Sequence, residues 1–247
     1  MSASLAGVAV VTGSSSGIGR AVAHALARQG MSVYLTGRDL ARLKDCALQI
    51  VSIGARAFEH QADLSTDEGI RGLVERVSAE PGRVDVLVHA AGTLGLGNLE
   101  AARWDDLDDQ YRVNLRAPFL LTKAFLPLLK ESLGQVVFIN SSAALAPAAD
   151  NALYASTKSA LRSLAEGIRS HVNSSGVRVL SVFPGRTATP MQAAVSSFEN
   201  RRYEPAELLQ PEDVAEIIVA TLGLPRTAEV TDIFIRPMRK PPSGRSQ

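Results

Sequence analysis

Residues 10–20 read VVTGSSSGIGR, and this segment decides the fold because it fits two different functional motifs. Residues 13–17 match G-x-S-x-G, the strained turn that presents a nucleophilic serine, here Ser15, in α/β-hydrolases. The same segment nearly matches the dinucleotide-binding pattern G-x-G-x-x-G, except that its glycines stand at positions 13, 17 and 19. The segment therefore predicts either a serine that attacks a substrate or a loop that binds phosphate groups.

The place of this segment in the chain favours the phosphate-binding loop. A nucleophilic serine needs an oxyanion hole that is partly supplied by a loop earlier in the chain, and only one predicted strand, residues 8–12, comes before the segment. Glycines allow the backbone to approach a pyrophosphate closely, and the helix predicted from Gly17 offers free N–H groups and the positive end of its dipole. Ser14, Ser15 and Ser16 add hydroxyl donors. From this segment alone, a flexible Gly/Ser turn without a ligand stays the alternative.

Beyond this segment, short β-forming runs alternate with longer helical ones. Several of the short runs are almost unbroken Val, Ile and Leu, which is typical of strands buried on both faces of a sheet. The alternation predicts an α/β fold in which helices cover both faces of a doubly wound parallel sheet. One domain is expected over residues 1–237, with a flexible, basic and Pro-rich tail at 238–247. The predicted strands are 8–12, 32–36, 56–60, 84–89, 136–140, 177–183 and 231–236, and the predicted helices are 17–29, 40–53, 66–79, 104–131, 154–173 and 211–222.

The composition is that of an ordinary globular protein, with 46% hydrophobic and 21% charged residues. A formal net charge of +1 gives no reason to expect a nucleic-acid partner. The single cysteine, Cys46, excludes a disulfide within the chain and is consistent with a reducing, cytoplasmic location. No apolar run is long enough to cross a bilayer, and the amino-terminal segment lacks the basic residues of a signal peptide, so no membrane partner is expected. The four histidines show no metal-binding spacing, which predicts no metal.

Tyr154 and Lys158 form the second chemical motif. Because positions i and i+4 share one face of a helix, the phenol and the ammonium group project together from the helix predicted at 154–173. A free phenol has a pKa near ~10 and is a poor acid or base at neutral pH, and a nearby ammonium lowers this pKa by favouring the phenolate. The pair therefore predicts a general acid/base. A Y-x-x-x-K pair alone often occurs by chance, and a serine pair that closes the preceding predicted strand gives it more weight.

Five motifs together resemble the classical short-chain dehydrogenase/reductase family. They are TGSSSGIG at 12–19, HAAG at 89–92, VN at 113–114, a serine followed by YASTK at 154–158, and PGRTAT at 184–189. The resemblance covers nearly the whole chain, with the motifs in the family's order and at its usual intervals. The family's first loop reads TGxxxGxG, so the resemblance assigns the glycine spacing to a phosphate loop. It also implies a Rossmann-type fold with strand order 3-2-1-4-5-6-7, and an oxidoreductase that transfers a hydride between a nicotinamide cofactor and an alcohol or carbonyl substrate.

The resemblance also implies roles for individual residues. Tyr154 would be the general acid/base, and Lys158 would lower its pKa and hold the hydroxyl groups of the nicotinamide ribose. Asn114 would hold a water molecule against Lys158 and complete a proton relay, or would simply be a buried amide at a helix bend. Asp63 would contact the adenine, or would only end the third strand. The implied cofactor-binding residues are Gly13, Ser15, Ser16, Gly17, Ile18, Gly19, Arg38, Asp63, Leu64, Ala91, Gly92, Tyr154, Lys158, Pro184, Gly185, Thr187 and Thr189.

The serine pair at the end of the fifth predicted strand raises a question of register. In the family the second serine of G-x-I-V-N-I-S-S acts in catalysis, seven residues after the glycine and thirteen before the tyrosine. Counting from Gly134 and counting back from Tyr154 both lead here to Ser141, the first serine of the pair. Because successive side chains of a strand point to opposite faces, we expect Ser141 to bind the substrate oxygen beside Tyr154, and Ser142 to support the following loop.

Residues 89–92 depart from the family pattern, which usually reads Asn-Asn-Ala-Gly at this point. The chain has His89, Ala90, Ala91 and Gly92, and so lacks two amide side chains that brace the sheet. Backbone contacts from this turn to the adenosine ribose can persist without them. We interpret His89 as a core histidine whose hydrogen bonds are satisfied.

The end of the second predicted strand, YLTGRD, bears on the choice between the two nicotinamide cofactors. NAD-binding sites usually place an acidic residue there for the ribose hydroxyl groups, and its carboxylate repels a 2′-phosphate. Here Thr36 or Gly37 takes that position, and Arg38 follows with a guanidinium suited to phosphate. Asp39 is expected to cap the next helix and to point away. The pattern favours NADP(H), with NAD(H) as the alternative, and a solvated loop charge is the other interpretation of Arg38.

The substrate is less well determined by the sequence. Residues 143–153 and 186–209 are expected to line its binding site at the carboxyl ends of the strands. Their apolar content, with Met191, Phe198 and Tyr203, favours a moderately hydrophobic, small-molecule alcohol or carbonyl compound. The motifs do not indicate the direction of the reaction.

Self-association is expected as well. The helical residues 115–130 and 154–170 carry more small and apolar side chains than one sheet-facing side requires, and the family pairs these helices across two-fold axes. A homodimer or homotetramer is therefore expected. Three other functions stay open: a serine hydrolase that uses Ser15, a cofactor-binding regulatory protein of the same fold, and a family member that isomerises or epimerises its substrate.

Overall fold

The computed structural model describes residues 5, 7–97, 100 and 102–239, which form a seven-stranded parallel sheet. The strand order is β3-β2-β1-β4-β5-β6-β7, and every neighbouring pair runs parallel. This arrangement confirms the predicted Rossmann-type, doubly wound α/β fold together with its strand order. Of the tail expected at 238–247, residues 240–247 lie outside the described residues. The strands are β1 (Val8–Thr12), β2 (Ser32–Gly37), β3 (Ala57–Gln61), β4 (Val86–His89), β5 (Gln135–Ile139), β6 (Arg178–Pro184) and β7 (Asp232–Ile235).

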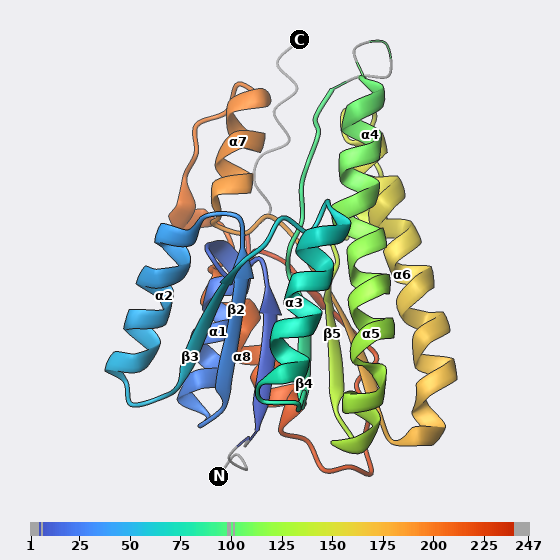
Figure 1. Ribbon diagram of the computed structural model, residues 1–247. Helices are drawn as coiled ribbons and strands as arrows, with labels where there is room; N and C mark the ends of the chain where they lie inside the picture. Colours follow the sequence, from blue (N-terminus) through green and yellow to red (C-terminus); the bar gives the residue numbers. More distant parts are fainter. Residues whose placement is uncertain (1–4, 6, 98–99, 101, 240–247) are drawn as a thin grey trace.

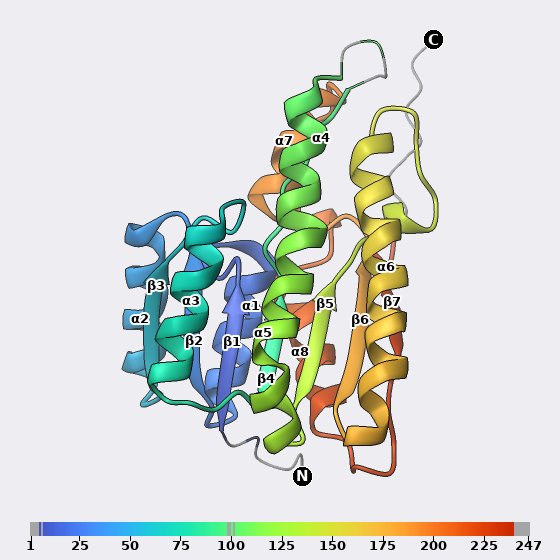
Figure 2. The same cartoon turned by 45° about the vertical axis from the view of Figure 1, so that its right-hand side comes forward.

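Helices cover both faces of the sheet (Figures 1 and 2). Helices α1, α2 and α8 pack on one face, and α3, α5 and α6 pack on the other. The alternation of side chains along each strand supplies both layers: Ala9 and Val11 of β1 face the first layer, and Val8 and Val10 face the second. The helices are α1 (Gly17–Arg28), α2 (Leu40–Ser52), α3 (Asp67–Ala79), α4 (Trp104–Tyr111), α5 (Ala117–Glu131), α6 (Ala152–Val172), α7 (Pro190–Phe198) and α8 (Pro211–Leu222).

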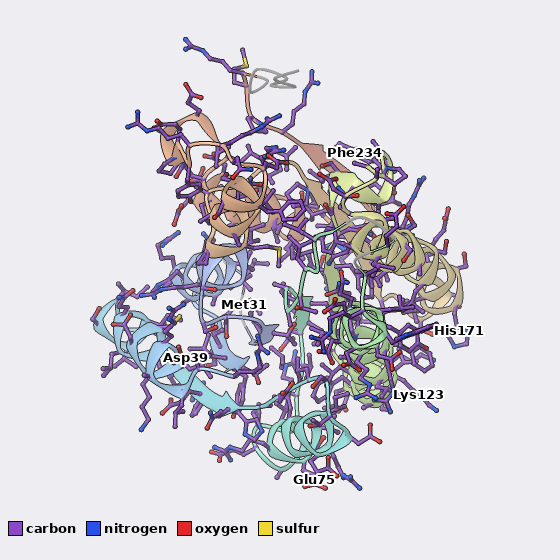
Figure 3. The ribbon with its side chains drawn as sticks, turned by 90° about the horizontal axis from the view of Figure 1, so that it is seen from above. Met31, Asp39, Glu75, Lys123, His171 and Phe234 are labelled. Atoms are coloured by element: carbon purple, nitrogen blue, oxygen red, sulfur yellow. The ribbon has the colours of Figure 1, made fainter. Side chains whose placement is uncertain are left out.

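The second helix layer shows why these segments are amphipathic. Viewed from above, Glu75 of α3, Lys123 of α5 and His171 of α6 point outward at the rim of the molecule (Figure 3). Leu73 and Phe125, on the inner sides of α3 and α5, are fully buried in the core. Burying a side chain of this size stabilises a fold by about 1.5–3 kcal/mol. Within the described residues, none of these helices has the length and apolar character needed to cross a membrane.

The helical region predicted at 104–131 is divided into three parts. Helix α4 is followed by a π-helical turn over Arg112–Arg116, and α5 then continues the path. Pro118, near the start of α5, has no N–H to donate to the carbonyl of Asn114 four residues earlier, which is one local reason for the irregular turn. Pro127, by contrast, lies inside α5 without ending it.

Two helices rise above the carboxyl edge of the sheet, where the strands of a parallel sheet all end. Figure 1 shows α4 and α7 standing above this edge on opposite sides. Helix α7 was not predicted, although its start carries a recognisable capping pattern. The Thr189 side chain accepts a hydrogen bond from the Gln192 N–H at 3.2 Å, and Pro190 occupies the first turn. Ligands of open α/β sheets bind at the carboxyl ends of the strands, so a binding site is expected at this edge.

Candidate active site

A cavity of about 640 Å³ runs along the carboxyl edge of the sheet. Its walls come from the turns after β1 to β6, from the start of α6 and from α7. Every residue predicted from the sequence to bind the cofactor lines this cavity, and so do Ser141, Tyr154 and Lys158. Asn114 does not line it and is buried behind the wall. Within the described residues, no group of three His, Cys, Asp or Glu side chains is arranged to hold a metal ion.

The turn after β1 is shaped by glycines that no other residue could replace without a shift. Gly13 has a φ of +67°, and a β-carbon there would lie 2.7 Å from the backbone nitrogen of Ala91. Gly17 has a φ of +54° and begins α1. Ser16, the N-cap residue of α1, makes no capping hydrogen bond with its side chain, so the first-turn N–H groups stay available to an anion. The close approach of two backbones beside a helix N-terminus suits a bound phosphate group.

The three serines of this turn differ in their surroundings. Ser14 is fully buried, and its N–H and hydroxyl both donate to the Thr36 carbonyl at 3.2 and 3.3 Å. The expectation that Ser14 offers a hydroxyl to phosphate is therefore wrong, because this side chain ties the turn to β2. Ser15 and Ser16 line the cavity. No histidine is among the described residues that line it, so Ser15 has no imidazole base nearby.

The turns after β2 and β3 form the far end of the cavity. Arg38 is exposed and lines this end. Asp39 accepts a hydrogen bond from the Arg42 N–H at 3.1 Å and caps α2, so its carboxylate is engaged by the helix, as expected. Asp63 accepts hydrogen bonds from the Ser65 N–H at 2.9 Å and hydroxyl at 2.8 Å. The Ser65 N–H is the main cause of a lowered pKa of the Asp63 carboxyl.

Tyr154, Ser141 and Lys158 meet in the middle of the cavity. The side chains of Ser141 and Tyr154 are hydrogen-bonded, and the Ser141 hydroxyl oxygen also accepts from the Ala143 N–H at 3.1 Å. The Lys158 Nζ is buried, donates to the Ile139 carbonyl at 2.9 Å and lies 5.8 Å from the centre of the Tyr154 ring. Burial lowers the pKa of Lys158 to about 8.

The pKa of Tyr154 differs from the sequence expectation. Loss of water around the phenol raises this pKa, and the hydrogen bond with Ser141 offsets the rise only in part. The expectation of a lowered pKa is therefore wrong: an ammonium nearby favours the phenolate, but desolvation of the buried phenol, which disfavours it, is the larger effect. In the protein alone, the tyrosine is therefore held as a protonated phenol at neutral pH.

Asn114 is positioned by the π-helical turn. Its amide oxygen accepts from the Thr93 N–H at 2.9 Å, and its nitrogen donates to the Thr93 carbonyl at 2.9 Å and to the Thr157 hydroxyl at 3.1 Å. These bonds join the segment after β4 to the residue before Lys158. A β-carbon at Gly92 would lie 3.4 Å from the Asn114 amide oxygen and 3.9 Å from the Lys158 Nζ. Asn114 thus has the contacts of a buried amide at a helix bend, close to Lys158, and the water relay stays a prediction.

The two serines after β5 have different environments. Ser141 is half-buried against Tyr154, whereas Ser142 is exposed and begins a short 3₁₀ turn, Ser142–Ala144. The Ser142 carbonyl accepts from the N–H groups of Leu145 and Ala146 at 3.1 and 3.2 Å, so this residue shapes the following loop. The residue count from Gly134 and Tyr154 thus leads to the serine that contacts the tyrosine.

His89 lies directly beneath the site and is only half satisfied. Its Nε2 is 2.8 Å from the Thr122 hydroxyl, and its ring stacks on Phe138 with the ring centres 4.9 Å apart. Its Nδ1 has no hydrogen-bond partner in the described structure, so the interpretation as a fully satisfied core histidine is wrong for this atom. Burial, with a smaller contribution from the charge of Lys158, lowers the pKa of His89 to about 3. The imidazole is therefore neutral.

The opposite end of the cavity, which we call the substrate end, is formed by α4, the loop between β5 and α6, and the segment from Arg186 to Glu199. Met191 lines it as expected. Phe198 and Tyr203 do not line the cavity, and Phe198 is exposed on the outside of α7, so the expectation was wrong for these two. Gln192, Val195 and Glu199 also line the cavity and lie within residues 186–209, as expected. Four further lining residues lie outside the expected ranges and were not predicted from the sequence: Leu94, Leu96, Asp109 and Asn140.

The fold and the cavity define an α/β protein of the Rossmann type, with a glycine-shaped anion site and a Ser–Tyr–Lys group at the carboxyl edge. Comparison with known proteins then identifies the family. Residues 7–200 match the model of the short chain dehydrogenases, and the chain belongs to this family.

Individual relatives agree with this assignment. An uncharacterized oxidoreductase of Staphylococcus saprophyticus is 33% identical over 238 residues, which cover 94% of this chain and 97% of that protein. An alcohol dehydrogenase from the archaeon Thermococcus sibiricus, solved with 5-hydroxy-NADP, aligns with a TM-score of 0.87 at 29% identity over 97% of this chain and 100% of that one. A short chain dehydrogenase from Burkholderia cenocepacia, solved with NADP, aligns with a TM-score of 0.81 at 32% identity over 92% and 95%. The chain is an oxidoreductase of this family.

Proposed function

We propose that the chain transfers a hydride between NADP(H) and a small alcohol or carbonyl compound. The observation that carries this proposal is the meeting of Ser141, Tyr154 and Lys158 beside the turn after β1, in one continuous cavity. The nicotinamide group supplies or accepts the hydride when it is bound. The residues present suit such a cofactor, since Gly13 leaves a gap against Ala91 that a β-carbon would fill and the start of α1 is uncapped.

In this proposal, the protein's own residues manage the proton and the position of the substrate. Tyr154 donates its phenolic proton to the substrate oxygen during reduction and takes it back during oxidation. Ser141 holds the same oxygen and orients it toward the phenol. Lys158 supplies a positive charge close to the phenol and would hold the ribose of a bound nicotinamide cofactor. Asn114 is a positioning residue, because its bonds to Thr93 and Thr157 fix the wall behind Lys158.

NADP(H) is proposed in preference to NAD(H) on two grounds. Arg38 reaches the far end of the cavity, while the neighbouring Asp39 carboxylate is occupied by the start of α2 and by Arg42 at 3.2 Å. A permanently charged guanidinium there favours a 2′-phosphate. In addition, the similar proteins from Thermococcus sibiricus and Burkholderia cenocepacia were solved with 5-hydroxy-NADP and NADP.

A panel of ketones, aldehydes, alcohols and sugars, followed at the nicotinamide absorbance with NADPH, NADH and their oxidised forms, tests the proposed function. Turnover with at least one carbonyl or alcohol is expected, with a lower KM for the NADP form. Arg38→Ala should raise the KM for NADPH by ~10-fold or more and leave the KM for NADH nearly unchanged. No turnover of any compound contradicts the proposed reaction, and a lower KM for NADH contradicts the cofactor preference.

We also propose that the chain forms a homodimer or homotetramer through α5 and α6, as the sequence predicts, with α4 contributing beside them. Trp104, Leu107 and Tyr111 recur at helical spacing on α4 and are 90%, 40% and 49% exposed, and Phe119 on α5 is 44% exposed. Exposed apolar side chains gathered along a helix are typical of a surface that is covered in an assembly. Light scattering at micromolar concentration is expected to give a dimer or tetramer, and a monomer would contradict this proposal.

A further inference from the structure

An ion pair closes the wall of the substrate end. Arg186 follows β6 and Glu199 directly follows α7, and both line the cavity. The two guanidinium nitrogens of Arg186 donate to the two carboxylate oxygens of Glu199 at 2.8 and 2.6 Å. This bidentate geometry is the one in which arginine also binds substrate carboxylates and phosphates.

The pair is well formed and partly shielded from water. The side chains of Arg186 and Glu199 are 33% and 18% exposed, and the Arg201 Nε lies 3.5 Å from the same carboxylate. Hydrogen bonds from Arg186 are the main cause of a lowered pKa of Glu199, so the carboxylate is ionised at neutral pH. The anion-binding face of Arg186 is therefore already filled by a group of the protein itself.

The other charged residues that line the cavity do not replace Arg186 as a binding group for an anionic substrate. Among the described lining residues, the basic groups are Arg38, Lys158 and Arg186. Arg38 stands at the far end and the Lys158 Nζ is bound to the Ile139 carbonyl, so Arg186 is the cation of the substrate end. Asp109 and Asp150 line this end too, and neither forms an ion pair with another residue in the described part of the chain. Because Glu199 pairs with Arg186, the substrate end has no positive charge left to bind an anionic substrate.

We propose that Glu199 makes the site selective for neutral substrates by occupying Arg186, which would otherwise bind a substrate carboxylate or phosphate. The inference rests on the proposed function, because it concerns the remote part of a substrate whose reacting oxygen meets Ser141 and Tyr154. An apolar lining by Leu94, Met191 and Val195 suits an uncharged body. Glu199 is thus a specificity-determining residue, and anionic ketones are rejected because their charge would face carboxylates without a free cation.

Two ketones that differ only in charge test the proposal: 4-acetylbenzoate and its methyl ester, reduced with NADPH. We expect the wild type to prefer the ester in kcat/KM by ~10²-fold, since like charges brought together in a closed site cost several kcal/mol. Glu199→Gln should raise kcat/KM for the acid by ~10-fold or more, with little change for the ester. The double variant Arg186→Gln/Glu199→Gln should lose this gain, which separates Arg186 from Arg201.

Glu204→Gln is the matched control, because Glu204 pairs with Arg202 at 2.6 Å and does not line the cavity. It should leave the ester-to-acid ratio unchanged. A second readout does not need turnover: benzoate binding to the NADP-loaded protein, measured by calorimetry, should tighten by ~10-fold in Glu199→Gln. If no ketone is reduced, the proposed function fails while the calorimetric result still tests the role of Glu199. Two results would overturn the inference. One is a wild type with a higher kcat/KM for the acid than for the ester. The other is equal benzoate affinity in the wild type and in a folded Glu199→Gln.

Discussion

The two ends of the cavity are built in different ways. We call the end formed by the turns after β1 to β4, where we propose that the cofactor binds, the cofactor end. It is made largely of backbone: Gly13 packs against the backbone of Ala91, and Ser14 is tied to the Thr36 carbonyl of β2. The substrate end is made of side chains from separate elements, such as Met191 of α7 and the pair between Arg186 and Glu199. A backbone surface is fixed by the sheet and tolerates little change. A side-chain surface can be altered without disturbing the fold, so the two ends should respond differently to substitution.

The proposed reacting centre lies where the backbone-built end of the cavity meets the end built from side chains. Lys158 is anchored to the backbone of β5 through the Ile139 carbonyl, and Ser141 is fixed by the Ala143 N–H. Tyr154 is held by Ser141 on one side. The proposed chemistry thus depends on side chains that are held in place by backbone groups, and substitutions here should have the largest effects.

Tyr154→Phe should have the largest effect, because it removes the proton donor and keeps the shape of the ring. We expect kcat to fall by ~10²-fold or more, the usual scale of general acid–base catalysis. The dissociation constant for NADPH, measured by fluorescence titration, should change by less than ~2-fold, since the cofactor end is built elsewhere. Near-wild-type kcat in this variant would remove the phenol from the mechanism.

Ser141→Ala and Ser142→Ala differ by one residue and form a matched pair. Ser141 contacts the phenol, so its loss should lower kcat by ~10-fold to ~10²-fold, as expected for a buried hydrogen bond to the reacting oxygen. Ser142 is exposed in the loop and should cost less than ~3-fold. Steady-state kinetics on one ketone give both values. A larger loss in Ser142→Ala would mean that the register of the strand end differs in the working enzyme.

The backbone-built end was the more predictable part of the site. Its glycines, the helix start at Gly17 and the cap at Asp39 follow from local rules that act over a few residues, and the sequence carries all of them. The Y-x-x-x-K spacing is equally local, whereas the count to Ser141 rests on the pattern of the family that the chain resembles. The strand order was implied by family resemblance, which carries long-range information that a local pattern does not.

The parts that were missed depend on tertiary contact. Glu199 meets Arg186 across thirteen residues of chain, and no spacing rule predicts such a pair. The inward turn of Ser14 depends on its distance from β2. The raised pKa of Tyr154 depends on burial, which the sequence does not state. Helix α7 is the exception, because Thr189 followed by Pro190 is a local capping pattern that predicts a helix start.

Gly13→Ala, compared with Gly54→Ala, should show how far the cofactor end depends on backbone contact. Both glycines have a left-handed φ, +67° and +83°, but a β-carbon at Gly13 would collide with Ala91, whereas at Gly54 nothing lies within 4 Å. Each change should cost about 1 kcal/mol of unfolding free energy through backbone strain, and Gly13→Ala should cost more than Gly54→Ala because of the collision. Only Gly13→Ala should weaken NADPH binding, by ~10-fold or more, because it shifts the phosphate turn. Equal affinities in the two variants would contradict the backbone construction of this end.

Lys158→Met should have the smallest effect on the fold and the most informative dependence on pH. Burial lowers the pKa of Lys158 to about 8 from an ordinary value of 10.5. Between these values the unfolded chain binds a proton that the native chain has released, so the wild type gains stability as pH rises through this window, at up to about 1.4 kcal/mol per pH unit. Below pH 8 the native state keeps a buried ammonium, which costs stability. Methionine has a similar length and no charge, so Lys158→Met should be at least as stable as the wild type at pH 7.

The difference in unfolding free energy between Lys158→Met and the wild type should shrink from pH 8 to pH 10. Urea unfolding of the cofactor-free protein at pH 7, 8.5 and 10 measures this difference, with Lys130→Met, at the exposed end of α5, as the control in which the difference stays constant. A wild type that exceeds Lys158→Met by the same amount at every pH would mean that the ammonium is well solvated, and that the buried charge of the catalytic centre does not oppose folding.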